Sequence, residues 1–286
     1  MTLAARHAWV QAAPCGPGCM RSGADEPGHR WVVALRTALR VTAAMTLLGG
    51  VWLLALPLPG RVRLQRGYCR LMLRSLGVRM RVSGGPIRNL PGVLVVSGHV
   101  SWLDVFALGA VLPGSFVARA DLLRLPALGP VVRMMRIIPI DRDRLRRLPD
   151  VVAAVSARLA AGHTVVAFPE ATTWCGLSHG RFRPAMFQAA VDAGRPVQPV
   201  RLSYRHRDGR PSTVPAFVGD DSLPASIARV ITARRTVCDL QVESLQLPGR
   251  DRRDLAARCE AAVLGHPAPR RQARPAGCDA ASALSA

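Results

Sequence analysis

The sequence predicts an α/β fold with a mostly parallel central sheet flanked by helices, preceded by an N-terminal membrane-associated helical segment. Two observations support the sheet. Short apolar runs of strand type recur from residue 78 onward, and stretches of helical periodicity, about 10 to 15 residues long, separate them. A third observation supports the membrane segment, because residues 41–60 carry no charge and arginines flank them on both sides.

The chain divides into four predicted parts. Residues 1–30 contain Pro, Gly and charges without an early apolar core, so we expect a flexible leader rather than a signal peptide. Residues 31–77 form the membrane-associated helical segment, and residues 78–265 form the main domain. Residues 266–286 are rich in Ala, Pro, Arg and Ser, so we expect a disordered tail.

The apolar run within residues 41–60 is about 19 residues long, near the minimum for crossing a bilayer. Gly49 and Gly50 interrupt this run, and Pro57 and Pro59 end it. Since arginines flank both sides, the positive-inside rule gives no clear orientation. Insertion into one leaflet is favoured over spanning, because it keeps both arginine clusters at one anionic surface. A buried core helix is the remaining alternative.

Residues 61–76 interleave arginines with apolar residues at near-helical spacing. This pattern is typical of a basic amphipathic helix on a membrane surface. The alternative is an ordinary surface helix packed against the domain. Both interpretations predict a helix here.

From residue 78 onward, strands and helices alternate. Each expected strand is a run of apolar, often branched residues bounded by turn residues, and each expected helix has apolar residues three or four apart. The expected strands cover residues 78–82, 93–97, 115–119, 137–141, 164–168, 197–204, 216–218 and 237–246. The expected helices cover residues 102–111, 127–135, 148–161, 184–193, 223–233 and 250–263. This alternation favours parallel strand pairing, since crossover helices connect parallel strands.

The chain is strongly basic, with a formal net charge of +21. Its 39 basic residues are all arginines, whose planar guanidinium pairs with phosphate oxygens. Such a protein binds polyanions, either nucleic acid or an anionic lipid surface. Aromatic residues make up only 5%, which gives little material for base stacking. A basic nucleic-acid-binding module is therefore the remote alternative.

The seven cysteines are spread along the chain, and only Cys15 and Cys19 lie near each other in sequence. No C-x-x-C pair and no Cys/His zinc spacing occurs. We therefore expect scattered reduced thiols, as is usual in a protein that faces the cytosol, with no metal site and no cofactor.

His99 and Asp104 form the first candidate catalytic pair. His99 follows the strand expected at residues 93–97, and open α/β sheets place their sites at the carboxyl ends of strands. Asp104 lies one turn into the next helix, where its carboxylate can accept a hydrogen bond from the imidazole. That contact would fix the tautomer and leave the other ring nitrogen free to take a proton. Ser101 is expected to cap the helix; a structural histidine at the helix start is the alternative.

A second strand end carries Phe168-Pro-Glu170, which places Glu170 at the same edge of the sheet as His99. Ala171 and Thr172 follow with amides and a hydroxyl. A loop of this kind can bind an oxyanion or a phosphate through its N–H groups. A solvated glutamate at a strand end is the alternative interpretation.

A third strand, expected at residues 137–141, lies between Arg136 and Arg142. A guanidinium at a strand end can make paired hydrogen bonds with phosphate. This block therefore predicts an anion-binding position.

As an ordered set, these motifs resemble those of the glycerophospholipid acyltransferases, in particular the bacterial 1-acyl-sn-glycerol-3-phosphate acyltransferases. The resemblance covers roughly residues 60–250. The four matching blocks are Gly98-His-Val-Ser-Trp-Leu-Asp104 (the family's N-H-x-S-x-x-D), Arg136-Ile-Ile-Pro-Ile-Asp-Arg142 (its phosphate-binding block), Val166-Ala-Phe-Pro-Glu-Ala-Thr172 (its F-P-E-G-T) and Val197-Gln-Pro-Val200 (its apolar strand near the acyl donor).

Three positions depart from the family's pattern. Gly98 replaces the usual Asn, Ala171 replaces the Gly of F-P-E-G, and Thr173 stands where many members have Arg. Alanine is disfavoured at residue 171 if the backbone there has positive φ. These departures bear on the acceptor's identity more than on the chemistry, since His99 and Asp104 are intact.

The resemblance implies an acyltransferase that moves a fatty acyl group from acyl-CoA or acyl carrier protein to the free hydroxyl of lysophosphatidic acid, making phosphatidic acid in phospholipid biosynthesis. His99 is the implied base and Asp104 its orienting partner, with no acyl-enzyme intermediate. The predicted substrate-binding residues are Arg142, Glu170, Ala171, Thr172, Ser101 and Arg136.

The resemblance also implies partners and a location. The partners are a lysophospholipid acceptor, a thioester donor and an anionic membrane surface, with no nucleic acid and no metal. We expect a cell-membrane protein with its active site on the cytoplasmic face. Acylation of another lysolipid, such as lyso-ornithine lipid, is the nearest alternative, and an inactive lipid-binding relative is a further one.

Overall fold

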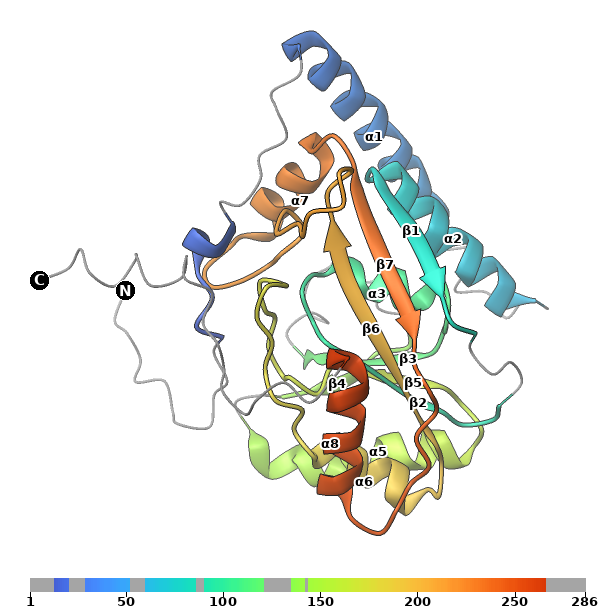
Figure 1. Ribbon diagram of the computed structural model, residues 1–286. Helices are drawn as coiled ribbons and strands as arrows, with labels where there is room; N and C mark the ends of the chain where they lie inside the picture. The colour runs from blue at the N-terminus through green and yellow to red at the C-terminus, as the bar shows by residue number, and fades with distance from the viewer. Residues whose placement is uncertain are drawn as a thin grey trace, which may run out of the picture.

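A single sheet organises the computed structural model, which describes residues 13–20, 29–51, 60–85, 90–120, 135–141 and 144–265. Its strands in these residues are β1 (Val78–Ser83), β2 (Leu94–Ser97), β3 (Ser115–Arg119), β4 (Ile138–Ile140), β5 (Val165–Ala167), β6 (Val197–Arg205) and β7 (Thr236–Val242). The strand order is β1-β7-β6-β2-β5-β3-β4 (Figure 1). Neighbouring strands are parallel except β6 and β7, which are antiparallel. The predicted α/β class and mostly parallel sheet are confirmed.

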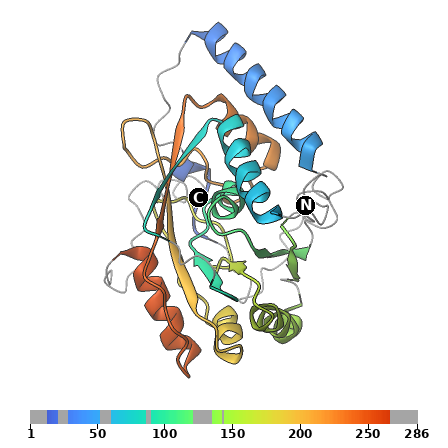
Figure 2. The same ribbon diagram turned by 90° about the vertical axis from the view of Figure 1, so that its right-hand side faces the viewer.

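Helices cover both faces of the sheet. The α-helices are α1 (Arg30–Gly50), α2 (Arg61–Ser75), α3 (Leu103–Gly109), α5 (Leu148–Ala160), α6 (Ala185–Asp192), α7 (Leu223–Thr232) and α8 (Arg252–Leu264), with short 3₁₀ helices η1 (Pro17–Met20) and η5 (Leu145–Arg147). One core cluster contains buried residues of α2, α3 and α7, and the other contains those of α5, α6 and α8. In Figures 1 and 2, α5, α6 and α8 lie at the end of the molecule far from α1.

Strand β2 shows why the sheet strands are continuously apolar. Val95 belongs to one core cluster, whereas Leu94 and Val96 belong to the other. Successive side chains point to opposite faces of a strand, and both faces of this sheet are covered. All four residues of β2 are therefore buried.

The structure departs from the expected elements at one place among the described residues. Residues 216–218 form no strand, because their backbone pairs with loops: the Phe217 amide donates to the Val100 carbonyl and the Ala216 amide to that of Thr213. The helix expected at residues 127–135 lies outside the described residues, apart from Met135. The remaining predicted elements are present within a few residues of their expected ends.

Helix α1 begins well before the uncharged run that predicted it and ends at Gly50, so residues 52–59 of that run lie outside the described part of the chain. Ala44 is its one buried residue. The guanidinium of Arg40 donates hydrogen bonds to the carbonyls of Ile231, in the last turn of α7, and of Ala233, which follows the helix. Because helix ends leave carbonyls without partners, Arg40 both completes α7 and fastens α1 to the domain.

Helix α2 combines the two interpretations that the sequence left open. Its Tyr68 and Met72 are buried in the core, while Val62, Leu64 and Leu71 are exposed. The helix therefore packs against the domain with one face and presents arginines and apolar residues on the other.

Candidate active site

The site lies where β2 and β5 end side by side. These strands are parallel neighbours, with Val96 opposite Ala167, so the loops that follow them leave the same edge of the sheet. The first loop carries His99 and leads into α3 with Asp104. The second carries Glu170. The sequence prediction that these three residues share one edge is confirmed.

The imidazole of His99 contacts the Asp104 carboxylate directly. The Nδ1–Oδ2 distance is 2.8 Å. A carboxylate that accepts at Nδ1 fixes the proton on that nitrogen, so Nε2 carries the lone pair. The His99 side chain is 19% exposed whereas that of Asp104 is 0% exposed, which leaves the ring accessible and its partner shielded from water.

Asp104 is fully supplied with hydrogen-bond donors. Its Oδ2 also accepts from the backbone amides of Val100 and Ser101, at 2.7 and 2.9 Å. Its Oδ1 accepts from the hydroxyl of Tyr204 on β6, at 2.6 Å. A buried carboxylate needs such partners to remain charged.

Glu170 is a buried link between loops. Its Oε2 accepts from the backbone amide of His99 at 2.8 Å, and its Oε1 accepts from that of Gly180 at 3.0 Å. Burial raises the pKa of Glu170 to about 8, although the two amide donors lower it. Oε2 thus holds the backbone at His99 and Oε1 holds that at Gly180, and contact with a headgroup stays a prediction for this residue.

Two further contacts hold His99 in place. The ring of Phe168 stacks on the imidazole, with centroids 4.0 Å apart and planes 15° apart. The backbone amide of Trp174 donates to the His99 carbonyl at 2.8 Å. The histidine is therefore restrained through its ring, its amide and its carbonyl.

The residues around the His99–Asp104 pair differ in their exposure to solvent. Ser101 is fully buried, and its Oγ accepts from the Leu103 amide at 3.3 Å, whereas the N-cap residue of α3 is Trp102. Contact of Ser101 with substrate stays a prediction. Thr172 is partly exposed. The hydroxyl of Thr173 donates to the carbonyl of Phe217 and is thereby engaged within the protein.

Ala171 adopts the left-handed backbone conformation, with φ of 60°. The backbone at residue 171 therefore has the positive φ that favours glycine. Without a Cβ, glycine enters this region at no steric cost, whereas alanine is strained.

The predicted phosphate-binding block is described only in part. Arg136 is exposed and also has positive φ, at 47°. Its carbonyl accepts from the guanidinium of Arg158 at 3.4 Å. Arg142 lies outside the described residues, so its role stays a prediction.

The expectation of scattered thiols is wrong for three cysteines. The sulfur atoms of Cys15, Cys19 and Cys175 lie within 4.8 Å of one another, and all three residues are buried. Cys175 directly follows Trp174, so the N-terminal segment packs beside the loop that holds His99. A hydrogen bond with Cys15, aided by the amides of Leu177 and Ser178, lowers the pKa of Cys175 to about 6. The prediction that the protein uses no metal stays a prediction.

Sequence reasoning missed Tyr204 and Trp174. Tyr204 belongs to the strand that was predicted on its apolar pattern, and its position relative to Asp104 depends on how β6 pairs in the sheet. Its alternation with Val200 and Leu202, which face the same core cluster, was the available signal.

The chain is similar in sequence to known proteins. Residues 79–203 match the protein family described as Acyltransferase. A 1-acyl-sn-glycerol-3-phosphate acyltransferase of Neisseria meningitidis is 36% identical over 58% of this chain and 65% of its own length. Lyso-ornithine lipid O-acyltransferases of Pseudomonas aeruginosa and Rhodobacter capsulatus are 33% and 31% identical, over 72% and 79% of this chain and 78% and 85% of their own lengths.

The fold also has a solved counterpart. The crystal structure of the 1-acyl-sn-glycerophosphate (LPA) acyltransferase from Thermotoga maritima superposes with a TM-score of 0.60 at 18% identity, covering 82% of this chain and 94% of that one. At this identity the match shows the fold. The chain spans slightly less than two thirds of the length of the neisserial relatives, at 65% and 64%.

Proposed function

Because this chain belongs to the acyltransferase family, we propose that it transfers a fatty acyl group from an acyl thioester to the free hydroxyl of a lysolipid, with lysophosphatidic acid as the first candidate acceptor. One observation carries the proposal. His99 is bonded through Nδ1 to the buried Asp104, while its ring is partly exposed. This is the arrangement of a general base with an orienting carboxylate.

The proposed reaction needs one histidine and no covalent enzyme intermediate. Nε2 of His99 takes the proton from the acceptor hydroxyl as the hydroxyl oxygen attacks the thioester carbonyl. The tetrahedral intermediate collapses, the C–S bond breaks, and the imidazolium returns its proton to the departing thiolate. Asp104 stabilises the imidazolium, and backbone N–H groups at the strand ends stabilise the oxyanion. The products are the diacyl lipid and a free thiol, of CoA or of acyl carrier protein.

The donor and acceptor define the first experiment. Purified protein is supplied with acyl-CoA or acyl carrier protein thioester, and with lysophosphatidic acid or lyso-ornithine lipid, and the lipid products are identified. The His99→Ala variant should lose turnover. The matched control is His163→Ala, which removes an exposed histidine just before β5, at the other end of that strand. Wild-type turnover in His99→Ala would refute the mechanism.

For a phosphate acceptor, we propose that Arg142, Glu170 and Thr172 position the headgroup, on the strength of the sequence motifs. The Arg142→Ala variant should raise KM for lysophosphatidic acid by about tenfold or more, because a guanidinium–phosphate contact is charge-assisted. Arg144→Ala is the control, since Arg144 is exposed and lies 3.8 Å from Asp141. Equal KM values for lysophosphatidic acid in both variants would show that Arg142 does not contact the headgroup.

Lyso-ornithine lipid is the second candidate acceptor, and two observations favour it. The lyso-ornithine lipid acyltransferases of Pseudomonas aeruginosa and Rhodobacter capsulatus align with this chain over more of their length than the neisserial relatives do. Thr173, which stands where many relatives carry an arginine, is engaged with the Phe217 carbonyl. The assay with lysophosphatidic acid and lyso-ornithine lipid distinguishes the two candidates. If the protein acylates only the ornithine lipid, the proposed mechanism still holds and the acceptor is the ornithine lipid.

We propose that α1 and α2 attach the protein to the anionic surface of the cell membrane, with the active site on the cytoplasmic face. Helix α1 is long and apolar enough to cross a bilayer, and little of it is buried. Arg36 and Arg40, in its first half, donate to carbonyls at the end of α7, so this half is docked on the domain. That docking supports insertion into one leaflet rather than spanning.

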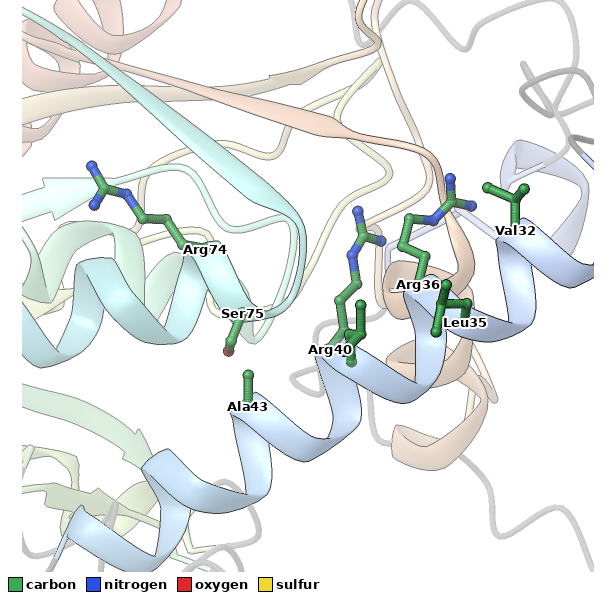
Figure 3. Close-up of a pocket in the computed structure, with 8 residues that line it drawn as sticks. Val32, Leu35, Arg36, Arg40, Ala43, Arg74 and Ser75 are labelled. Carbon is green, nitrogen blue, oxygen red and sulfur yellow. The ribbon is translucent and has the colours of Figure 1, made fainter.

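A groove between α1 and α2 adds to the apolar surface (Figure 3). Its volume is ≈ 390 Å³, and its walls include Val32, Leu35 and Leu39 of α1 and Arg74 and Ser75 of α2. None of the residues that line it belongs to the His99–Asp104 pair. Vesicle flotation with and without anionic phospholipid tests the attachment. Release from membranes by high salt alone would contradict insertion, and labelling of an engineered surface cysteine on intact cells would test the orientation.

A further inference from the structure

The two oxygens of the Asp104 carboxylate are held from different parts of the fold. Oδ2 accepts from the loop that the aspartate itself closes: His99 Nδ1 and the amides of Val100 and Ser101. Oδ1 accepts from Tyr204, one hundred residues further along the chain. The three loop donors lie within five residues of Asp104 in the sequence. Among the described bonds, Tyr204 is the one that ties this carboxylate to the sheet.

Tyr204 is itself held by the neighbouring strand. In the antiparallel pairing of β6 with β7, Tyr204 lies directly opposite Cys238, so the two side chains are neighbours on one face of the sheet. Tyr204 is 5% exposed and Cys238 is 0% exposed. Burial, and secondarily the Asp104 charge, raises the pKa of Tyr204 well above its usual value, so the hydroxyl stays a donor.

We propose that Tyr204 is a positioning residue for His99, acting through Asp104 to aim Nε2 at the acceptor hydroxyl. The inference rests on the proposed acyl transfer. A buried carboxylate oxygen without a donor is unfavourable, so loss of the phenol hydroxyl would let Asp104 turn toward another partner. The imidazole would then lose its fixed orientation even though every catalytic group is still present.

The chain supplies a matched control for the test. It contains two tyrosines, and the other one, Tyr68 on α2, is also buried. The hydroxyl of Tyr68 has no hydrogen-bond partner in the described structure. Tyr204→Phe and Tyr68→Phe therefore remove the same atom from two buried rings, and only the first change breaks the bond to Asp104.

We expect Tyr204→Phe to lower kcat by about tenfold, as loss of one hydrogen bond to a charged group predicts. KM values for lysolipid and thioester should stay within about twofold, because Tyr204 is buried away from substrate. Tyr68→Phe should keep wild-type kcat. Cys238→Ala, which removes the buried side chain directly opposite Tyr204, should lower kcat by about two- to threefold, because it loosens the packing that holds the phenol. The inference is overturned if Tyr204→Phe and Tyr68→Phe have the same kcat, or if Tyr204→Phe raises KM alone.

A spectroscopic readout separates this inference from the proposed function. The imidazole Nδ1 proton of His99 is shared with a carboxylate, so it should give a downfield proton NMR signal in histidine-labelled protein. We expect this signal to shift or broaden in Tyr204→Phe and to be unchanged in Tyr68→Phe. An unchanged signal in Tyr204→Phe refutes the coupling, whatever the activity. A wild-type protein that acylates no lysolipid refutes the proposed function, while the signal still decides whether Tyr204 holds the pair. If Tyr204→Phe does not fold, kcat and the NMR signal are measured in Cys238→Ala instead.

Discussion

Replacing Ala171 with glycine should stabilise the protein, although glycine usually weakens a fold. Ala171 has φ of 60°, in the region that L-residues with a Cβ enter only under strain. That strain amounts to about 1–2 kcal/mol for a non-glycine residue. Against this, glycine adds about 0.4–1 kcal/mol of conformational freedom to the unfolded chain. The difference between the middle values of these ranges is a net gain of about 0.8 kcal/mol in the free energy of unfolding.

The control is the same substitution where the backbone is relaxed. Ala161 follows α5 with φ of −72° and is exposed, so no strain is relieved there. Ala161→Gly should lower stability by about 0.5–1 kcal/mol. For a domain of this size, we expect Tm to rise by about 1–3 °C in Ala171→Gly and to fall by a similar amount in Ala161→Gly.

The assay is thermal unfolding of both variants beside the wild type, in one buffer and one detergent. Turnover of Ala171→Gly should stay within about twofold of wild type, because the left-handed backbone is already present. Equal decreases in Tm for both variants would refute the strain at Ala171. An unchanged Tm with altered acceptor preference would also contradict it, since the residue would then act through its methyl group.

Three other changes test the site and its supports. Asp104→Asn should lower kcat on the order of 10²- to 10³-fold, because the amide keeps a hydrogen bond to His99 but no longer stabilises the imidazolium; wild-type kcat in this variant would contradict that role. The pKa of Glu170 in the folded protein is about 8, above its usual 4.5, so the protonated side chain stabilises the fold. This stabilisation is lost as pH rises from about 4.5 to 8. The stability difference between wild type and Glu170→Gln, followed by chemical unfolding, should therefore shrink over this interval, and a difference that grew with pH would show that the ionised carboxylate is the stabilising form. Arg40→Met should speed hydrogen exchange in α1 and at the end of α7 while leaving β2 and β5 unchanged, because it removes the bonds that dock α1; unchanged exchange in α1 would mean that its apolar contacts suffice.

Local sequence determined most of the elements and the central pair. Strand β2 is apolar at every position because both faces of the sheet are covered, so its ends could be predicted to within a residue. The contact between His99 and Asp104 was also predictable, since five residues across a strand end and one helical turn bring the two groups together. Residues 216–218 show the limit of this reasoning, because a short apolar run does not reveal whether its backbone will find a strand or a loop to pair with.

The sequence by itself determined the α/β class, the site at the carboxyl ends of β2 and β5, and the histidine–aspartate pair, because each depends on periodicity or on residues a few positions apart. Only the tertiary structure decided what surrounds the pair. Glu170 turned inward to two backbone amides, Tyr204 reached Asp104 from another strand, and Cys15 came to lie against Cys175. These contacts join residues tens to hundreds of positions apart, and they follow from strand order and packing, which no local pattern specifies.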